Sequence, residues 1–165
     1  MNEQERFHAT EKFLKLMEQH KQIIYKVCFM YAPDDETISD LFQEVTLNLW
    51  KAFPHFRGES KLTTWIYRIA VNTCVSWLRS SSRRPQTVPL TLSMGDLMAD
   101  EQEKENLREL YTLINRLGKL ERALILLWLE ERSYEEIAEI LEISVSNVGV
   151  RINRIKAKLR EMSNN

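Results

Sequence analysis

Hydrophobic residues recur along this chain every three to four positions, which is the spacing of an amphipathic helix. No stretch shows the alternation with a period of two that a half-buried strand requires. The pattern therefore predicts an all-α protein. The predicted helices run from residue 7 to 31, from about 34 to 53, from 61 to about 82 and, with breaks at Gly118, Arg132–Ser133 and Ile143–Ser144, from about 105 to the C-terminus.

Each predicted helix has one apolar face, and we expect that face to be buried. The expected core residues are Phe13, Leu14, Met17, Ile24, Val27, Cys28 and Tyr31 in the first helix; Ile38, Leu41, Phe42, Val45, Leu49 and Phe53 in the second; Leu62, Ile66, Ala70, Thr73 and Trp77 in the third; and Val148, Ile152, Ile155, Leu159 and Met162 in the last.

The helical period is absent from residues 83–104, which contain two of the four prolines. Such a segment is typical of a flexible linker. We therefore expect two small helical domains, residues 1–82 and 105–165, joined by this linker.

The composition indicates a globular protein of the cytoplasm. The 165 residues are 44% hydrophobic and 28% charged. No apolar run reaches the ~18–20 residues that span a bilayer, and the first 13 residues lack the apolar core of a secretory signal. Cys28 and Cys74 lie within apolar helical patterns, so we expect buried free thiols. The three histidines lack partners at ligand spacing, and we expect no metal, cofactor or catalytic residue.

The net charge of −1 conceals a strong segregation of charge. Residues 1–44 carry −4 and residues 85–142 carry −7, whereas residues 45–84 carry +6 and residues 143–165 carry +4. Two basic segments on separate helices favour two contacts with one long polyanion. The acidic segments then either mask those contacts or meet a different, basic partner.

The sequence from residue 133 to 162 predicts a helix-turn-helix. Ser133 and Glu136 have the spacing of a capping box, and Ser144 offers a second N-cap before a longer helix. The outer face of that helix carries short polar groups that can reach base edges and cations that can reach phosphates. Its candidate duplex-binding residues are Ser144, Ser146, Asn147, Val150, Arg151, Asn153, Arg154 and Lys158. An ordinary amphipathic helical hairpin would show the same spacing. It would not explain why the second helix is basic and the segment before it acidic.

Two further features lie in the N-terminal half. Leu47 projects from the polar face of the second helix among acids and amides, which is either a chance exposed leucine or a docking face for a basic partner. Trp65 lies at the edge of the row of cations on the third helix, near Phe56. Rings beside cations suit unpaired bases, although these rings could equally close the edge of the core.

The motifs "DLFQEVTLNLWKAFPHFRGESKLTTWIYRIAVNTCVSWLR" and "YEEIAEILEISVSNVGVRINRIKAKLR" resemble the second and fourth conserved regions of bacterial sigma factors. With only these two regions, the chain is similar to the extracytoplasmic-function (ECF) group. The resemblance implies core RNA polymerase and promoter DNA as partners, an anti-sigma protein as a further one, and a linker that threads toward the polymerase active-site channel.

The resemblance also implies residue roles. The polymerase contact would comprise Asp40, Leu41, Gln43, Glu44, Leu47 and Trp50. The minus-ten element would be opened and a flipped base captured by Phe56, Arg57, Lys61, Trp65, Arg68, Asn72 and Arg79. The helix-turn-helix residues given above would read the minus-thirty-five element.

The chain departs from the family at three positions. Where the family usually has Leu-Pro before the third-last helix, this chain has "LGKLERA", and where the family commonly has a basic residue in the last helix, it has Gly149. The position commonly held by glycine in the turn is Glu142, where a positive φ costs about 1 kcal/mol. Two other interpretations stay open: a free-standing helix-turn-helix regulator, which would bind duplex DNA without polymerase, and a helical adaptor that binds no nucleic acid.

Overall fold

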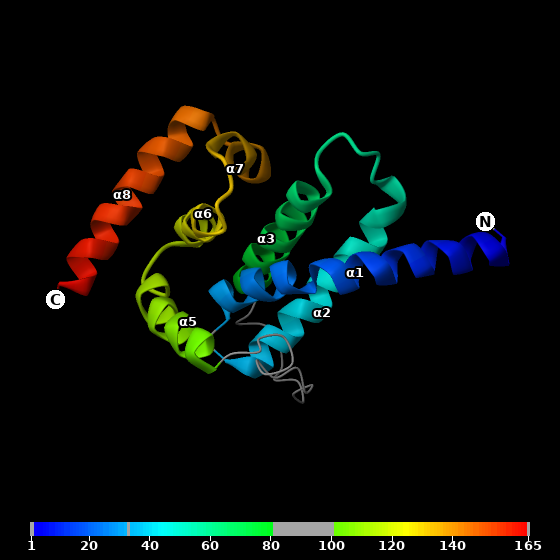
Figure 1. The fold of residues 1–165 in the computed structure, drawn as a ribbon, viewed down its shortest axis with the longest axis horizontal. Helices are drawn as coiled ribbons and strands as arrows, with labels where there is room; N and C mark the ends of the chain where they lie inside the picture. The colour runs from blue at the N-terminus through cyan, green and yellow to red at the C-terminus, as the bar shows by residue number, and fades with distance from the viewer. Residues whose placement is uncertain (1, 33, 81–100, 165) are drawn as a thin grey trace.

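The computed structural model describes residues 2–32, 34–80 and 101–164 of the chain, and within this part every regular element is helical (Figure 1). The all-α prediction is confirmed. The elements are α1 (Glu3–Tyr31), α2 (Asp35–Ala52), the short 3-10 helix η1 (Phe53–His55), α3 (Leu62–Ser80), α5 (Glu101–Ile114), α6 (Lys119–Leu129), α7 (Tyr134–Leu141) and α8 (Val145–Ser163). None of these helices is both long and apolar enough to cross a membrane.

Helices α1, α2 and α3 pack against one another and form the N-terminal half. The expected stripes of α2 and α3 supply its core, with Leu41, Val45, Ile66 and Ala70 fully buried. Thr73 is one of three buried polar residues in α2 and α3, with Ser39 and Thr64, and its hydroxyl donates to the Ile69 carbonyl and accepts from the Asn48 amide. A satisfied hydroxyl of this kind costs little to bury.

The first helix differs from its predicted form at its N-terminal end. It begins at Glu3 because Asn2 caps it, with the Glu5 amide donating to the Asn2 side chain. Leu14, expected in the core, is 61% exposed, whereas Leu16 is buried. The neighbouring Phe13 packs against Trp50 of α2 and Phe53 of η1, so Leu14 is exposed because it lies to one side of the face of α1 that meets these elements.

Cys28 and Cys74 are both buried and reduced, as predicted. They come from α1 and α3, and each is fully enclosed. Burial raises the pKa of the Cys28 thiol, and the neighbouring Cys74 adds to the effect. Both groups therefore act as small apolar core residues.

Helices α5 to α8 form the C-terminal half. The predicted breaks at Gly118, Ser133 and Ser144 are the N-caps of α6, α7 and α8. Ser133 and Ser144 each accept a hydrogen bond from the backbone amide three residues ahead. Val148, Ile152 and Ile155 are buried as predicted, so α7 and α8 form the expected helix-turn-helix.

Two glutamates provide the left-handed turns that end α6 and α7. Glu131 has φ 60° and Glu142 has φ 57°. After each glutamate, the backbone amide of the next residue donates a hydrogen bond to the carbonyl five positions earlier: Arg132 to Leu127, and Ile143 to Ala138. Glu142 thus adopts the conformation that favours glycine.

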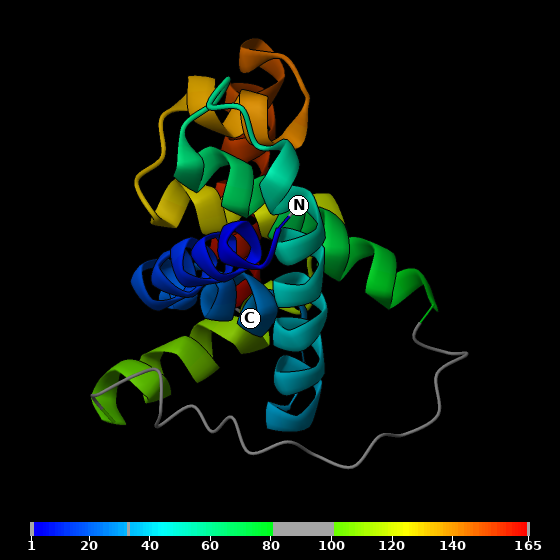
Figure 2. The ribbon, with the colours of Figure 1, turned by 90° about the vertical axis from the view of Figure 1, so that its right-hand side faces the viewer.

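The two halves also pack against each other, α1 on α6 and α3 on α7, and the two views agree on this arrangement (Figure 2). Helix α3 ends at Ser80 and α5 starts at Glu101, four residues before the expected helical restart. Residues 83–100 of the expected linker lie outside the described part of the chain. The domain limits at 82 and 105 stay predictions.

Candidate functional site

The exposed side of α2 presents two large apolar side chains among polar ones. Leu47 is 47% exposed and Trp50 42%. The Trp50 ring meets Phe13 edge to face, with 5.1 Å between ring centres, which holds it in place. We define the α2 surface as Asp40, Gln43, Glu44, Leu47 and Trp50.

Leu41 does not belong to that surface. The resemblance assigns it to the polymerase contact, but its side chain is fully buried because it lies in the apolar stripe that packs α2 onto its neighbours. A partner docked on α2 cannot touch this side chain, so Leu41 supports the surface from beneath.

A row of aromatic rings connects α2 to the loop before α3. The Phe56 ring lies 4.9 Å from Trp65, the Phe53 ring lies 6.5 Å from Trp65, and Phe13 continues the row toward Trp50. Trp65 is half-buried. It therefore closes the edge of the core with one part of its ring and leaves another part accessible.

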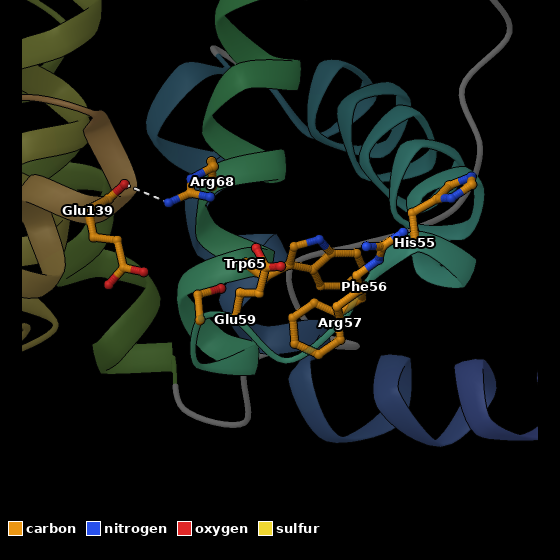
Figure 3. A pocket seen from close by; sticks show the side chains of 8 residues that line it. His55, Phe56, Arg57, Glu59, Trp65, Arg68 and Glu139 are labelled. Carbon is orange, nitrogen blue, oxygen red and sulfur yellow. Dashed lines mark hydrogen bonds between the residues drawn. The ribbon is translucent and has the colours of Figure 1, made fainter.

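The accessible part of Trp65 lines a cavity of about 580 Å³ between the loop and α3 (Figure 3). Arg57 and Arg68 line the same cavity. A pair of rings flanked by guanidinium groups can stack an unpaired base and hold its phosphates. We define the aromatic–basic surface as Phe56, Arg57, Lys61, Trp65, Arg68, Asn72 and Arg79.

The structure does not bring all of these residues into one cavity. Asn72 and Arg79 are exposed further along α3, and Asn72 lines a second hollow of about 360 Å³ together with Asn48 and Ser76. Four residues of the surface share the first cavity, and Asn72 marks a separate one.

Helix α8 presents its polar face outward. Val150 is 49% exposed, and Ser146, Asn153 and Arg154 are exposed beside it. The remaining candidates Ser144, Asn147, Arg151 and Lys158 already have partners: Ser144 caps the helix, Arg151 Nε donates to Asn147 Oδ1 at 3.1 Å, and Lys158 contacts Glu121 at 3.4 Å.

The sequence did not predict the other residues around the first cavity. His55 lines it from the end of η1, Glu59 and Ser60 line it from the loop, and Glu139 reaches it from α7 (Figure 3). The first three of these residues lie within four positions of Phe56 in sequence and could have been inferred as its neighbours. Glu139 is 71 positions from Arg68, and no local pattern indicates that contact.

Both halves match known families. Residues 16–84 match Sigma-70 region 2, and residues 107–159 match Sigma-70 region 4. Among curated relatives, the ECF RNA polymerase sigma-E factor of Haemophilus influenzae is 35% identical over 133 residues, covering 72% of this chain and 70% of the relative. The sigma-E factor of Escherichia coli is 32% identical over 152 residues, covering 84% and 78%.

Solved structures show the same fold. The structure of CnrH in complex with the cytosolic domain of CnrY matches with a TM-score of 0.70 at 19% identity, covering 94% of this chain and 89% of that one. The sigma factor RpoE in complex with the anti-sigma factor NepR from Bartonella quintana matches with a TM-score of 0.72 at 18% identity, covering 93% and 98%. The chain belongs to the ECF group of RNA polymerase sigma factors, with a region 2 domain followed by a region 4 helix-turn-helix domain.

Proposed function

We propose that this sigma factor divides promoter recognition and opening among three separate surfaces. The α2 surface binds core RNA polymerase, the aromatic–basic surface holds the opened minus-ten element, and the outer face of α8 reads the minus-thirty-five element as duplex. The protein is a specificity subunit in this scheme, and the polymerase carries out the chemistry.

The observation that carries the proposal is the cavity of about 580 Å³ beside the rings of Phe56 and Trp65, which are in contact and tilted by 38°. Unstacking a base costs a few kcal/mol. A ring pair flanked by Arg57 and Arg68 can return that free energy through stacking and phosphate contacts. Strand opening can then be driven by binding, without nucleotide hydrolysis.

The α2 surface supports the polymerase assignment. Leu47 and Trp50 offer apolar area for burial, and the carboxylates of Asp40 and Glu44 flank it. An apolar centre with an acidic rim complements a helical partner that is basic around an apolar stripe. We place this contact, and therefore the protein, in the cytoplasm with the polymerase.

An anti-sigma protein is a further proposed partner. One related structure is of a sigma factor in complex with an anti-sigma factor, and the other is of CnrH with the cytosolic domain of CnrY. We propose that a protein of this class binds the present chain and withholds it from polymerase.

Permanganate oxidation of unpaired thymines tests the proposal directly. Run-off transcription of genomic fragments with core polymerase first supplies a promoter. We expect reactive thymines in its minus-ten element only when protein and polymerase are both present. Strand opening by polymerase alone, or opening unchanged by removal of the Phe56 ring, would contradict the proposal.

A further inference from the structure

Val150 lies at the centre of the outer face of α8. The opposite side of the helix carries the buried line of Val148, Ile152 and Ile155. At about 100° per residue, Val150 projects within roughly 20° of the direction directly opposite to this line. Its side chain is 49% exposed, so the helix presents an apolar group where a duplex in front of it would make contact.

Polar residues surround Val150 on the helix surface. Ser146 lies one turn before it, Asn153 and Arg154 lie one turn after it, and all three are exposed. A valine at this position adds no burial to the core, and valine favours a helix less than arginine or lysine does. The stability of the fold therefore does not account for this side chain, which points to a role in binding.

The side of Val150 toward Gly149 carries no bulky group. Gly149 has no side chain, and a Cβ at this position would lie 3.4 Å from the Tyr134 ring of α7. Helix α7 therefore packs beside Gly149 and leaves Val150 exposed. Ser146 and Ala157 on the same face are also small. Side chains this short let the helix approach base edges closely enough for a valine to touch them.

The chemistry of valine favours one base. Its side chain has no hydrogen-bond donor or acceptor, so a polar base atom that it covers in the major groove loses its hydrogen bond to water. Guanine, adenine and cytosine present polar groups there, whereas thymine also presents its 5-methyl group. Burial of that methyl group against the methyl groups of valine is favourable. Thymine is therefore the base that Val150 fits.

We infer that Val150 reads a thymine of the minus-thirty-five element through the 5-methyl group of that base. This inference rests on the proposed reading of the element by α8. The polar side chains of Asn153 and Arg154, next to Val150, serve the adjacent base pairs. Recognition of the element then depends on one methyl group as well as on hydrogen bonds.

Replacement of thymine by deoxyuridine tests this contact, because deoxyuridine lacks only the 5-methyl group and keeps the base pair. The promoter supplied by run-off transcription is prepared with each thymine of its minus-thirty-five element, on either strand, replaced in turn. Each duplex competes with the labelled, unmodified promoter for the complex of the full chain with core polymerase. Fluorescence anisotropy then gives the relative affinity.

We expect one replacement to weaken binding by the wild type about fourfold, which is the loss for one buried methyl-sized group. Val150→Ala should bind the unmodified promoter more weakly and lose no further affinity on that replacement. Alanine favours a helix more than valine does, so this variant should stay folded, as circular dichroism can verify.

Val145→Ala is the matched control. Val145 is 42% exposed in the same helix, but it projects about 140° away from Val150. This variant removes the same side chain from another side of α8. It should therefore keep the fourfold effect of the replacement.

An effect of equal size in Val150→Ala and the wild type would assign the methyl contact to another residue and overturn the inference. A minus-thirty-five element without thymine, or one in which no replacement changes the affinity, would also overturn it. If scrambling the whole element changes the affinity while no replacement does, the proposed function stands and only the inference fails. If scrambling has no effect either, the proposed reading by α8 fails as well.

Discussion

Single residues in this protein hold conformations that cost free energy, and the turn of the helix-turn-helix is the clearest case. Glu142 has φ 57° and ψ 44°, a left-handed conformation in which a Cβ approaches the following carbonyl oxygen. The turn keeps its geometry because Ile143 donates to the Ala138 carbonyl and both elements pack on the core.

Glu142→Gly should therefore stabilise the protein, by about 0.5–1 kcal/mol in the free energy of unfolding, because glycine has no Cβ penalty there. Urea unfolding measures the difference. Glu142→Ala is the control, since it removes the carboxylate but keeps the Cβ and should give no such gain. Equal gains in both variants would attribute the effect to charge and contradict the strain.

At the scale of elements, each helix uses one face for the core and another for a partner. Helix α2 buries Leu41 and Leu49 while exposing Leu47 and Trp50. Helix α8 buries Ile152 while exposing Arg154. A substitution on an outward face should therefore affect binding and leave the fold intact.

Leu47→Ala should weaken binding to core polymerase by about 1–2 kcal/mol, because it removes apolar area from the centre of the α2 surface. Surface plasmon resonance with purified core enzyme measures the change. Leu14→Ala is matched in chemistry and exposure on α1 and should bind like the wild type. A loss of the same size in both variants would contradict the α2 assignment.

Arg154→Ala should weaken recognition of the upstream element by about 1–3 kcal/mol if the guanidinium makes a bidentate base contact. The measurement compares a duplex carrying that element with a scrambled duplex. Arg160→Ala removes one exposed cation from the last turn of the same helix, and we expect it to weaken both duplexes alike. Discrimination that survives Arg154→Ala would exclude this residue as a base reader.

The sequence predicts these elements well where one face is uniformly apolar. Val148, Ile152 and Ile155 are buried as expected because a helix places them on one line. The prediction fails at Leu14, which is exposed although the neighbouring Phe13 is buried against Trp50 and Phe53. Periodicity identifies an apolar face but not how much of its width the neighbouring elements cover.

At the scale of the whole molecule, the sequence predicts two halves, each with an acidic segment followed by a basic one, but not how the halves meet. The contact of Arg68 with the Glu139 carbonyl joins positions 71 residues apart, and the buried Tyr31 hydroxyl reaches the Lys119 backbone. No periodic signal encodes such pairs, because their geometry depends on the packing of entire helices. The charge pattern alone allows the acidic segments either to mask the basic ones or to meet a different, basic partner. The ion pair between Glu136 of α7 and Lys61 favours masking.

The central claim is that the aromatic–basic surface holds unpaired bases, and promoter opening measures it most directly. The decisive assay compares the initial rate of RNA synthesis by core polymerase with Phe56→Leu protein on a duplex promoter and on the same promoter with a pre-melted minus-ten element. Leucine keeps apolar bulk against Trp65 but cannot stack on a base. We predict a large loss of rate on the duplex and a much smaller loss on the pre-melted template; equal losses on both would contradict the account.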